Sequence, residues 1–450
     1  MQPPRVGPPR RRSLRRVVLL GLVLGGVLGS HAAPGFAGDD AHTAHVAARG
    51  DVGAELLQSF VELGEACYPQ WVAYFGIEPK KDRLPLAMDV RKDRDGFLRA
   101  LTSAGVAGAA ALAGAGGYYD PGSRVSYLYL QPHLSSTRLL VLHELTHQFQ
   151  YKAVLGDRSD RSPTWHKEGL AEHFGCHRRT AKGLETGVLD MVAIDDRPTQ
   201  CAKLVASGGF DPWAVGTGTA KTVDYTVALT MVETLLLTKD ASLRAALRTW
   251  EKDLDKSADP FARFAKDFSG KQARLEAAVK EVWGEFRRPW KVVYIAWDEE
   301  PGFLVGRGLP WAFLEGQIPM KAEANAIEAD LRVDGMQGGG GIALGVHGPD
   351  DLVSADLWAG GQLTLRVKKA GVWTLLGSAT TTGAGPTGTT HLKLSTRGTA
   401  VLVEVGGFPA ISVDVSGSGL TMLDLQGRAG LISESTTVRF ANVHVGSPPP

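Results

Sequence analysis

The sequence lacks an excess of charge of either sign. Its 49 lysines and arginines balance 48 acidic residues, so the formal net charge of the 450-residue chain is +1. A protein that binds nucleic acid or an anionic membrane through its bulk charge needs a marked basic excess. We therefore expect no nucleic-acid partner.

Cysteine is scarce, with only Cys67, Cys176 and Cys201 in the whole chain. Three cysteines without a CxxC pair exclude a disulfide-rich scaffold and a cysteine-based zinc site. In an oxidising compartment Cys176 and Cys201 could close a short loop, which would leave Cys67 unpaired. Three free and buried thiols are the alternative.

A long apolar run is also absent, although a bilayer span needs about 20 such residues. The N-terminal run covers only Val17 to Leu28, follows the arginines at 10–12 and 15–16 and precedes small residues up to Ala37. This order is typical of a secretory signal. We expect residues 1–37 to be a signal peptide, so that the protein is exported to the periplasm or the extracellular space and keeps no membrane span. The paired arginines of "RRSLRR" also fit twin-arginine export, although ordinary secretion is the simpler route.

The pattern of apolar residues changes once along the chain. Residues 53–76 repeat apolar side chains at helical spacing, namely Leu56, Phe60, Leu63, Cys67 and Trp71. Strands are indicated at 83–90 and 125–130, a small-residue helix running into a loop at 103–117, and helices dominate up to 285. This predicts an α+β domain over 50–285 that begins with a mixed sheet and is mainly helical after it.

Beyond residue 290 the sequence carries short alternating segments separated by glycine-rich turns, such as "QLTLRV", "AVLVEV" and "AISVDV". Alternation with period two is the pattern of half-buried antiparallel strands. We expect an all-β jelly-roll sandwich over 318–446, joined to the first domain by a connecting segment at 286–317.

The sequence "HELTH" places two histidines four residues apart, at His143 and His147, with Glu144 between them. On a helix these two imidazoles lie on one face a turn apart, where both can bind one metal ion. This HExxH pattern should arise by chance in roughly two chains per hundred of this composition. It therefore needs a second, independent match.

That match is "PTWHKEGLAEHFG" at 163–175, which carries Glu168 and Glu172 one helical turn apart. Together the two motifs resemble those of the gluzincin metallopeptidases, and most closely the peptidase MA-like bacterial families. The resemblance implies one catalytic Zn²⁺ per chain, held by His143, His147 and Glu168, with Glu172 orienting a ligand histidine. It implies Glu144 as the catalytic base. Glu172 as the ligand in place of Glu168 is the alternative.

Two features depart from that family. His166 and Lys167 stand where the family commonly has Leu-Asn, and the longer aminopeptidase signature is absent. Substrate contacts and aminopeptidase specificity therefore do not carry over. His173 and His177 also lie four apart, but without an acidic partner pattern they are expected to face solvent rather than a metal.

The resemblance also implies a donor to the reacting carbonyl oxygen from a later helix. Tyr225 lies at a suitable distance along the chain for this catalytic role, and a buried core tyrosine is the alternative. The strand at 123–131 matches the edge strand along which such peptidases bind an extended peptide.

The C-terminal segment resembles concanavalin-like and laminin-G-like sandwiches. Such modules often bind glycans, and Trp358 or Trp373 could stack on a sugar or simply pack the sandwich. Two functions follow from the sequence: an exported zinc peptidase acting on a peptide or protein, with a possible glycan or cell-wall polymer bound by the sandwich, or a non-catalytic glycan-binding or adhesion protein. An intact Glu144 favours the peptidase, since a scaffold needs no carboxylate beside the metal.

Overall fold

A computed structural model describes residues 39–132, 134–155, 162–180, 182–189, 197–254, 256–286, 290–292, 297–300, 302–308, 311–316, 324–335, 337–381, 388–418 and 420–446. The predicted signal peptide lies outside the described residues. Within them, no helix is both long and apolar enough to cross a membrane.

The first part of the chain is built on a five-stranded sheet in the order β1-β2-β3-β5-β4. Its strands are β1 (Asp39–His42), β2 (Val46–Gly50), β3 (Leu86–Arg91), β4 (Gly117–Asp120) and β5 (Val125–Tyr129). The central strands β2, β3 and β5 are parallel, and β4 pairs antiparallel with β5. The sheet thus begins before residue 50, the predicted domain boundary. The predicted edge strand β5 is an inner strand, because β4 covers it.

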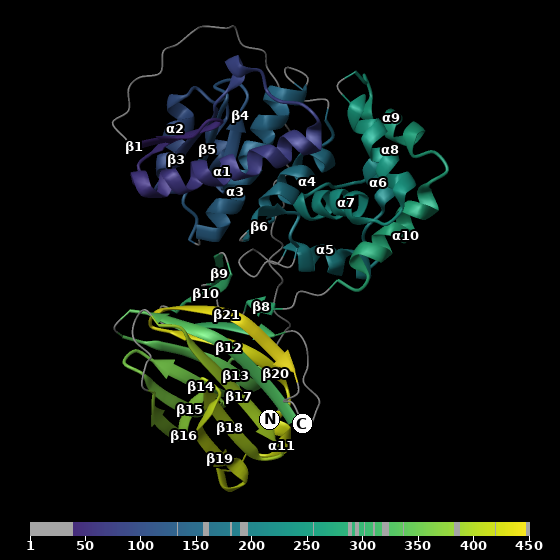
Figure 1. The fold of residues 1–450 in the computed structure, drawn as a ribbon. Helices are drawn as coiled ribbons and strands as arrows, with labels where there is room; N and C mark the ends of the chain where they lie inside the picture. The colour runs from purple at the N-terminus through teal and green to yellow at the C-terminus, as the bar shows by residue number, and fades with distance from the viewer. Residues whose placement is uncertain are drawn as a thin grey trace, which may run out of the picture. The chain divides into compact units, whose positions relative to one another are not determined.

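Helix α1 (Ala54–Phe75) forms where the apolar spacing predicted it, and it packs on this sheet with α3 (Leu134–Phe149) (Figure 1). Its inward face uses Leu57 rather than the predicted Leu56, which is only half-buried. The rings of Trp71, Phe149 and Phe174 pack together in this core. The helix α3 is therefore fixed from one side by aromatic packing.

The small-residue segment at 103–117 is not the predicted helix. A helix that was not predicted, α2 (Arg94–Ser103), precedes it, and its first turn is capped by the carboxylate of Asp93. The segment itself forms only a short 3-10 turn, η2 (Ala109–Gly114). Alanine favours helix, but Gly105 and Gly108 take positive φ values of 74° and 72°, which interrupt it.

Helices dominate the chain after α3, as predicted. They are α4 (Thr164–Gly175), α5 (Arg197–Ala206), α6 (Pro212–Gly216), α7 (Tyr225–Leu237), α8 (Ala241–Lys252), α9 (Pro260–Asp267) and α10 (Gln272–Trp283). A π-helical segment, η3 (Gln150–Leu155), extends α3, and a hairpin of β6 (His177–Thr180) and β7 (Gly183–Thr186) follows α4. The first turns of α7, α8 and α9 are capped by Asp224, Asp240 and Asp259. These carboxylates accept hydrogen bonds from otherwise unpaired N–H groups.

Helices α4 and α7 pack unusually closely at Gly169. A Cβ atom at this position would lie 2.4 Å from both the carbonyl oxygen of Ala228 and a methyl group of Val232. Only glycine allows this approach, because any other side chain would have to push the helices apart. The closeness brings the start of α7 beside the residues on α4.

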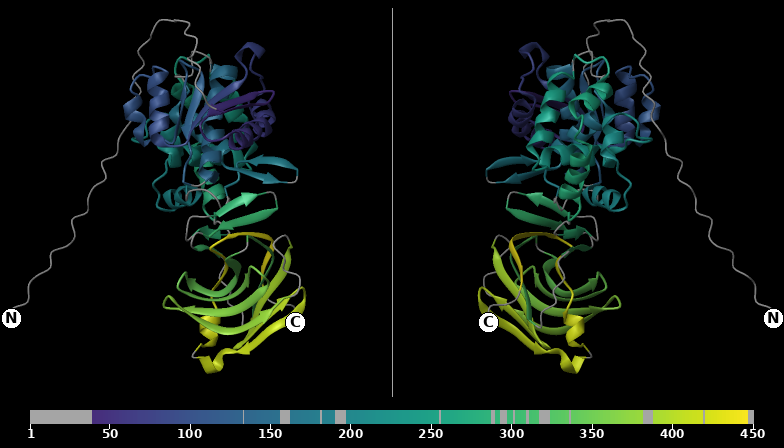
Figure 2. Two further views of the ribbon diagram at one scale, coloured as in Figure 1. Left: turned by 90° about the vertical axis from the view of Figure 1, so that its left-hand side faces the viewer. Right: turned by 90° about the vertical axis from the view of Figure 1, so that its right-hand side faces the viewer.

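The C-terminal part is a sandwich of two antiparallel sheets, as Figures 1 and 2 show. Each sheet has seven strands in the described residues. One sheet runs β19-β18-β17-β12-β21-β10-β9 and the other β16-β15-β14-β13-β20-β11-β8. The strands are β8 (Trp290–Val292), β9 (Trp297–Glu300), β10 (Phe303–Arg307), β11 (Trp311–Gly316), β12 (Ala324–Asp334), β13 (Gly339–Gly348), β14 (Asp351–Trp358), β15 (Gln362–Lys369), β16 (Val372–Thr380), β17 (Thr390–Arg397), β18 (Ala400–Val405), β19 (Phe408–Asp414), β20 (Arg428–Glu434) and β21 (Thr437–Gly446).

The predicted β-sandwich is confirmed by this strand pairing, but its extent differs from the prediction. The segment 286–317, predicted as a connection, contributes β8 to β11 to the two sheets. These strands are short, and their alternation is too brief to stand out from the sequence. The core between the sheets is filled by alternate residues of the strands, including Ile327, Leu344, Leu365 and Val403.

All three cysteines are buried, and none of them forms a disulfide bond. Of the two possibilities left open by the sequence, three buried thiols describe the structure, and a bond between Cys176 and Cys201 does not. Burial raises the pKa of the Cys67 thiol well above its usual range. Such thiols pack as small apolar groups.

Candidate metal centre

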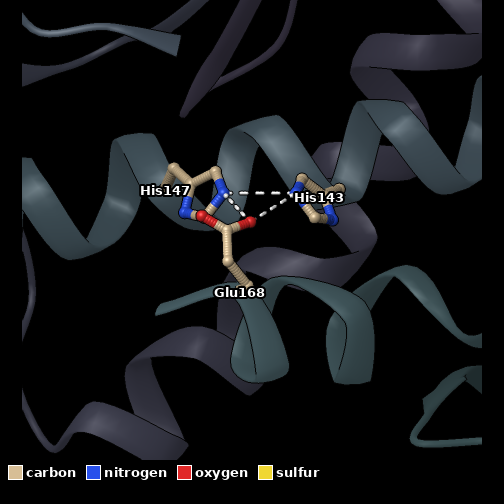
Figure 3. A group of neighbouring side chains, drawn as sticks. All are labelled: His143, His147 and Glu168. Carbon is tan, nitrogen blue, oxygen red and sulfur yellow. Dashed lines mark hydrogen bonds and ion pairs between the residues drawn. The ribbon is translucent and has the colours of Figure 1, made fainter. Parts of the chain in front are cut away.

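Helix α3 places His143 and His147 one turn apart on the same face, and their Nε2 atoms lie 3.2 Å from each other (Figure 3). The ring planes are nearly perpendicular, at 86°. Both imidazoles therefore point the same nitrogen at a common position. This is the arrangement that the spacing of the two histidines predicts.

Helix α4 brings Glu168 to the same position from the opposite side (Figure 3). Its Oε2 lies 3.4 Å from Nε2 of His143 and 3.4 Å from Nε2 of His147. Two separate sequence motifs thus meet in space. Within the described part of the chain, these three side chains form the group that could hold a metal ion.

The separations of the three donor atoms fit a tetrahedral zinc ion. Zinc binds histidine nitrogen and carboxylate oxygen at about 2.0–2.2 Å, which puts tetrahedral ligand atoms about 3.3–3.6 Å apart. The observed separations of 3.2, 3.4 and 3.4 Å are close to that range. Two imidazoles and one carboxylate are a common ligand set of catalytic zinc, and they leave a fourth position for water.

The electrostatics of the group favour a cation at this position. Burial alone would lower the pKa of His143, but hydrogen bonds to Glu168 and Glu172 and the charges of Glu172 and Glu144 raise it to about 10. Burial would likewise raise the pKa of Glu168, but the two histidines hold it well below its usual range. The acidic side chains therefore stabilise positive charge on the imidazoles, as they would stabilise a metal ion between them.

Glu172 lies behind His143, on the side away from the shared position. Its Oε1 is 3.1 Å from Nδ1 of His143, and its other carboxylate oxygen contacts the guanidinium of Arg197 at the start of α5. Both contacts lower its pKa, although burial opposes them. A carboxylate in this position fixes the orientation of a metal-binding imidazole. Glu172 itself is only 2% exposed and does not reach the shared position.

Glu144 is buried next to the ligands and lies against strand β4. A Cβ atom on Gly117 would come within 2.9 Å of both Cγ and Oε1 of Glu144, so the missing side chain leaves the space that this carboxylate occupies. The backbone N–H of Tyr119 donates a hydrogen bond to it. Burial raises the pKa of Glu144, while the two histidines lower it, and the net direction is upward. A raised pKa suits a group that takes up a proton near neutral pH.

Tyr225 is the first residue of α7, and its ring centroid lies 5.8 Å from that of His143. It is 49% exposed, so it is not the buried core tyrosine of the alternative reading. The guanidinium of Arg197 stacks 5.2 Å from its ring centroid. Burial of the hydroxyl and the charges of Glu168, Glu144 and Glu172 raise its pKa, so the phenol keeps its proton.

His173 and His177 do not face solvent, contrary to the prediction. His173 on α4 pairs with the fully buried Glu233 of α7 at 2.8 Å, which links these two helices. His177 lies in β6 rather than on the helix, which ends at Gly175, and it is also buried. Neither belongs to the metal group. No acidic partner for His173 stands out in the sequence, because Glu233 lies 60 residues further along the chain.

Three features of the site were not predicted from the sequence: Arg197 behind Glu172, Gly117 against Glu144, and β4 as the edge strand. Arg197 stands in no motif, and only the packing of α5 brings it to α4. Gly117 is one of 55 glycines, so nothing in the sequence distinguishes it from the others. The turn "DPG" after β4 does indicate a hairpin and could have revealed the strand before it.

A cluster of polar and aromatic residues lies on the sandwich sheet that contains β14 and β15. The guanidinium of Arg366 lies 4.9 Å from the ring centroid of Trp358 and 4.2 Å from that of Trp373. It also pairs with Asp356 at 2.9 Å and with Glu434 at 3.1 Å. Asp356 is 1% exposed, and its Oδ1 atom has no hydrogen-bond partner among the described residues.

Neither tryptophan belongs to the core between the two sheets. The alternating neighbours Val353, Ala355 and Leu357 fill that core from β14, which places Asp356 and Trp358 on the other face of the sheet. Trp373 packs against a smaller cluster that includes Phe313 and Ile432. The two rings are thus arranged around Arg366 on an outer face.

No protein-family model matches the chain, and no curated protein matches it in sequence. Among solved structures it is similar to the carbohydrate-binding module CBM66 from Bacillus subtilis, at 17% identity over 35% of this chain and 96% of that one, with a TM-score of 0.32. A protein of unknown function with a galectin-like fold from Bacillus subtilis matches at 11% identity over 35% and 89%, with a TM-score of 0.29. Sheep galectin-11 matches at 10% identity over 30% and 96%, with a TM-score of 0.25. The sandwich architecture accordingly rests on the strand pairing of this chain itself.

Proposed function

We propose that the protein is an exported zinc-dependent peptidase of gluzincin type. The observation that carries this proposal is the triangle of donor atoms from His143, His147 and Glu168, with separations of 3.2–3.4 Å, beside the buried carboxylate of Glu144. Three metal-binding side chains without a neighbouring base would fit a metal-storage site or a structural metal site equally well. The carboxylate of Glu144 beside them supports hydrolysis, because it can accept a proton from a metal-bound water.

The three ligands would hold one Zn²⁺, which supplies a water of lowered pKa and polarises a carbonyl group when bound. Glu144 accepts the proton of the attacking water and returns it to the nitrogen of the leaving amine. The phenol of Tyr225, which its surroundings keep protonated, donates a hydrogen bond to the carbonyl oxygen as negative charge develops there. Glu172 and Arg197 hold the orientation of His143.

The position of strand β4 supports a peptide as the substrate. It is the edge of the sheet, and it runs from Gly117, which touches Glu144, to Asp120. The edge of a sheet offers unpaired N–H and C=O groups to which an extended peptide adds as a further strand. A substrate bound in this way would have its backbone next to the catalytic carboxylate.

The zinc-loaded protein and its Glu144→Gln variant test the reaction. We expect about one zinc per chain in both, and cleavage of a mixed peptide library by the parent protein only. Loss of the proton acceptor should reduce turnover by about 10²–10⁴-fold. His143→Ala should in addition lose the metal. Equal cleavage by Glu144→Gln, or full zinc occupancy in His143→Ala, would overturn the proposal.

Export is tested separately by sequencing the N-terminus of the mature protein. Cleavage after Ala32, Ala33 or Ala37 is expected, in protein recovered outside the cytoplasm. An intact N-terminus on cytoplasmic protein would contradict this part of the proposal.

A second candidate function is glycan binding by the sandwich, with or without catalysis elsewhere. The observation that favours it is the outer-face cluster of Trp358, Trp373 and Arg366 with the partnerless oxygen of Asp356. Aromatic faces beside carboxylate and guanidinium groups bind the two sides of a sugar ring. Trp373→Ala should abolish binding on a glycan array, whereas Phe408→Ala, at an exposed phenylalanine of β19, should not. Equal binding by both variants would exclude this surface.

A further inference from the structure

A cavity of about 390 Å³ lies in the helical part of the first domain, on a side of α4 that does not carry the metal ligands. It is lined by the C-terminal end of α1, by η3, by α4 and by α8 with the residues that follow it. His166 faces it from α4. Glu168 is two residues further on, which is about 200° around the helix, and points to α3 instead.

The walls of this cavity are partly apolar. Phe75 and Ile77 contribute from the end of α1, and Leu254 contributes from the segment after α8. Ile77 is 45% exposed, whereas Leu254 is only 3% exposed. Covering Ile77 with an apolar ligand would be favourable, because it removes apolar surface from water.

Three cations and one carboxylate line the same cavity, namely Arg248, Lys252, Lys256 and Glu251. The carboxylate is fully occupied within the protein. Its Oε1 accepts hydrogen bonds from Tyr74 at 2.5 Å and from Nε2 of His166 at 3.1 Å, and its Oε2 pairs with Arg248 at 3.0 Å.

These hydrogen bonds keep Glu251 ionised and hold both of its oxygens in contacts within the protein. Burial would raise its pKa, but His166, Tyr74 and Arg248 lower it. The charge at the mouth of the cavity is therefore set by Lys252 and Lys256. Both are exposed, and among the described residues Lys256 pairs with Asp253 at 3.5 Å, a contact that is weak at the surface.

We propose that this cavity binds a small ligand that consists of a carboxylate on an apolar body. The volume lies within the range of ligand cavities, the walls at Phe75, Ile77 and Leu254 suit an apolar body, and the two lysines at the mouth complement a single negative charge. A free fatty acid and the C-terminal apolar residue of a peptide share this chemistry. The site is separate from the metal centre and needs no zinc.

Calorimetric titration of the full chain with decanoate and with N-acetyl-leucyl-leucine tests the proposal. We expect saturable binding of at least one of them, at one site per chain. The tighter of the two identifies the source of the ligand. Decyltrimethylammonium, which has the same tail with a cationic head, should bind at least about tenfold more weakly. No saturable binding of either carboxylate, or equal binding of the cationic analogue, would overturn the proposal.

Two variants locate the site. Lys252→Gln/Lys256→Gln should weaken binding about five- to tenfold, because each exposed charge contributes modestly, and Ile77→Asp should weaken it further by placing a like charge and a polar group on the apolar wall. The exposed Lys221 and Lys266 lie outside the cavity lining, so Lys221→Gln/Lys266→Gln is the matched control. Binding that the control weakens as much as the cavity variants would refute the location. All titrations are repeated in Glu144→Gln, whose unchanged affinity separates this site from peptide hydrolysis.

Discussion

Replacing Glu168 by glutamine should weaken zinc retention more than the same replacement at Glu172. The two residues lie one turn apart on α4 and both contact His143, but with different nitrogens. Glu168 faces Nε2, which is the atom aimed at the metal position, whereas Glu172 faces Nδ1 on the other side of the ring. The first change therefore removes a ligand, and the second removes the support of a ligand.

The expected difference in zinc affinity between the two variants follows from the contacts of the two side chains. Structural zinc sites with four ligands bind with about 10–16 kcal/mol, so one ligand contributes about 2.5–4 kcal/mol, or roughly 10²–10³-fold in affinity. Supporting carboxylates contribute about 10- to 100-fold. Glu172→Gln should lie near the upper end of that range. Its single amide oxygen cannot serve both His143 and Arg197, which the carboxylate now contacts with separate oxygens.

Competition for zinc against a chromogenic chelator measures both affinities without any substrate. Circular dichroism of each variant confirms that the fold is intact, and Glu276→Gln, an exposed glutamate on α10, controls for the loss of one negative charge. If Glu172→Gln empties the site while Glu168→Gln leaves it filled, the two roles must be exchanged. If neither variant differs from the control, the metal is bound elsewhere.

Two further substitutions address neighbours of the site, and a third prediction concerns a buried histidine outside it. Gly117→Ala puts a methyl group 2.9 Å from Glu144 and should lower kcat about 100-fold with zinc retained, and activity equal to that of the parent would refute this steric argument. Tyr225→Phe should lower kcat about 10²–10³-fold with little change in zinc content, and an unchanged kcat would remove the phenol from the mechanism. Burial lowers the pKa of His177 from 6.5 to about 4, so the unfolded chain takes up this proton first as the pH falls. Urea unfolding should therefore show a loss of about 2 kcal/mol between pH 7 and pH 5 that His177→Gln does not show, and the same loss in the variant would assign it to another group.

The meeting of His143, His147 and Glu168 was predictable because the pattern that places them is local. The spacing of His143 and His147 on one helix determines their geometry, and Glu168 belongs to a second short motif on another helix. The residues that complete the site were not predictable, since Arg197 and the edge strand β4 depend on how distant segments pack. Periodicity in sequence reports which face of an element is buried, but not which neighbour covers it.

The fold likewise divides into elements that a sequence pattern predicts and elements that it does not. Long periodic segments such as α1 and the sandwich strands were predicted correctly. The strands between 290 and 316 were not, because elements of three to six residues hold too few repeats to establish a period. The helix expected at 103–117 does not form for a different reason, since the glycines at positive φ interrupt it despite the helix preference of its alanines.

The contact at Gly169 has a consequence for recognising related sequences. A methyl group there would meet the carbonyl oxygen of Ala228 at 2.4 Å, so the residue after Glu168 is restricted by the neighbouring helix. A search pattern for chains that share this centre should therefore require glycine directly after the third ligand, and should read it as a mark of a tightly apposed later helix. A chain with the same ligands but a larger residue at that position would have to hold the two helices further apart, and a tyrosine at the start of the later helix would then lie further from the metal.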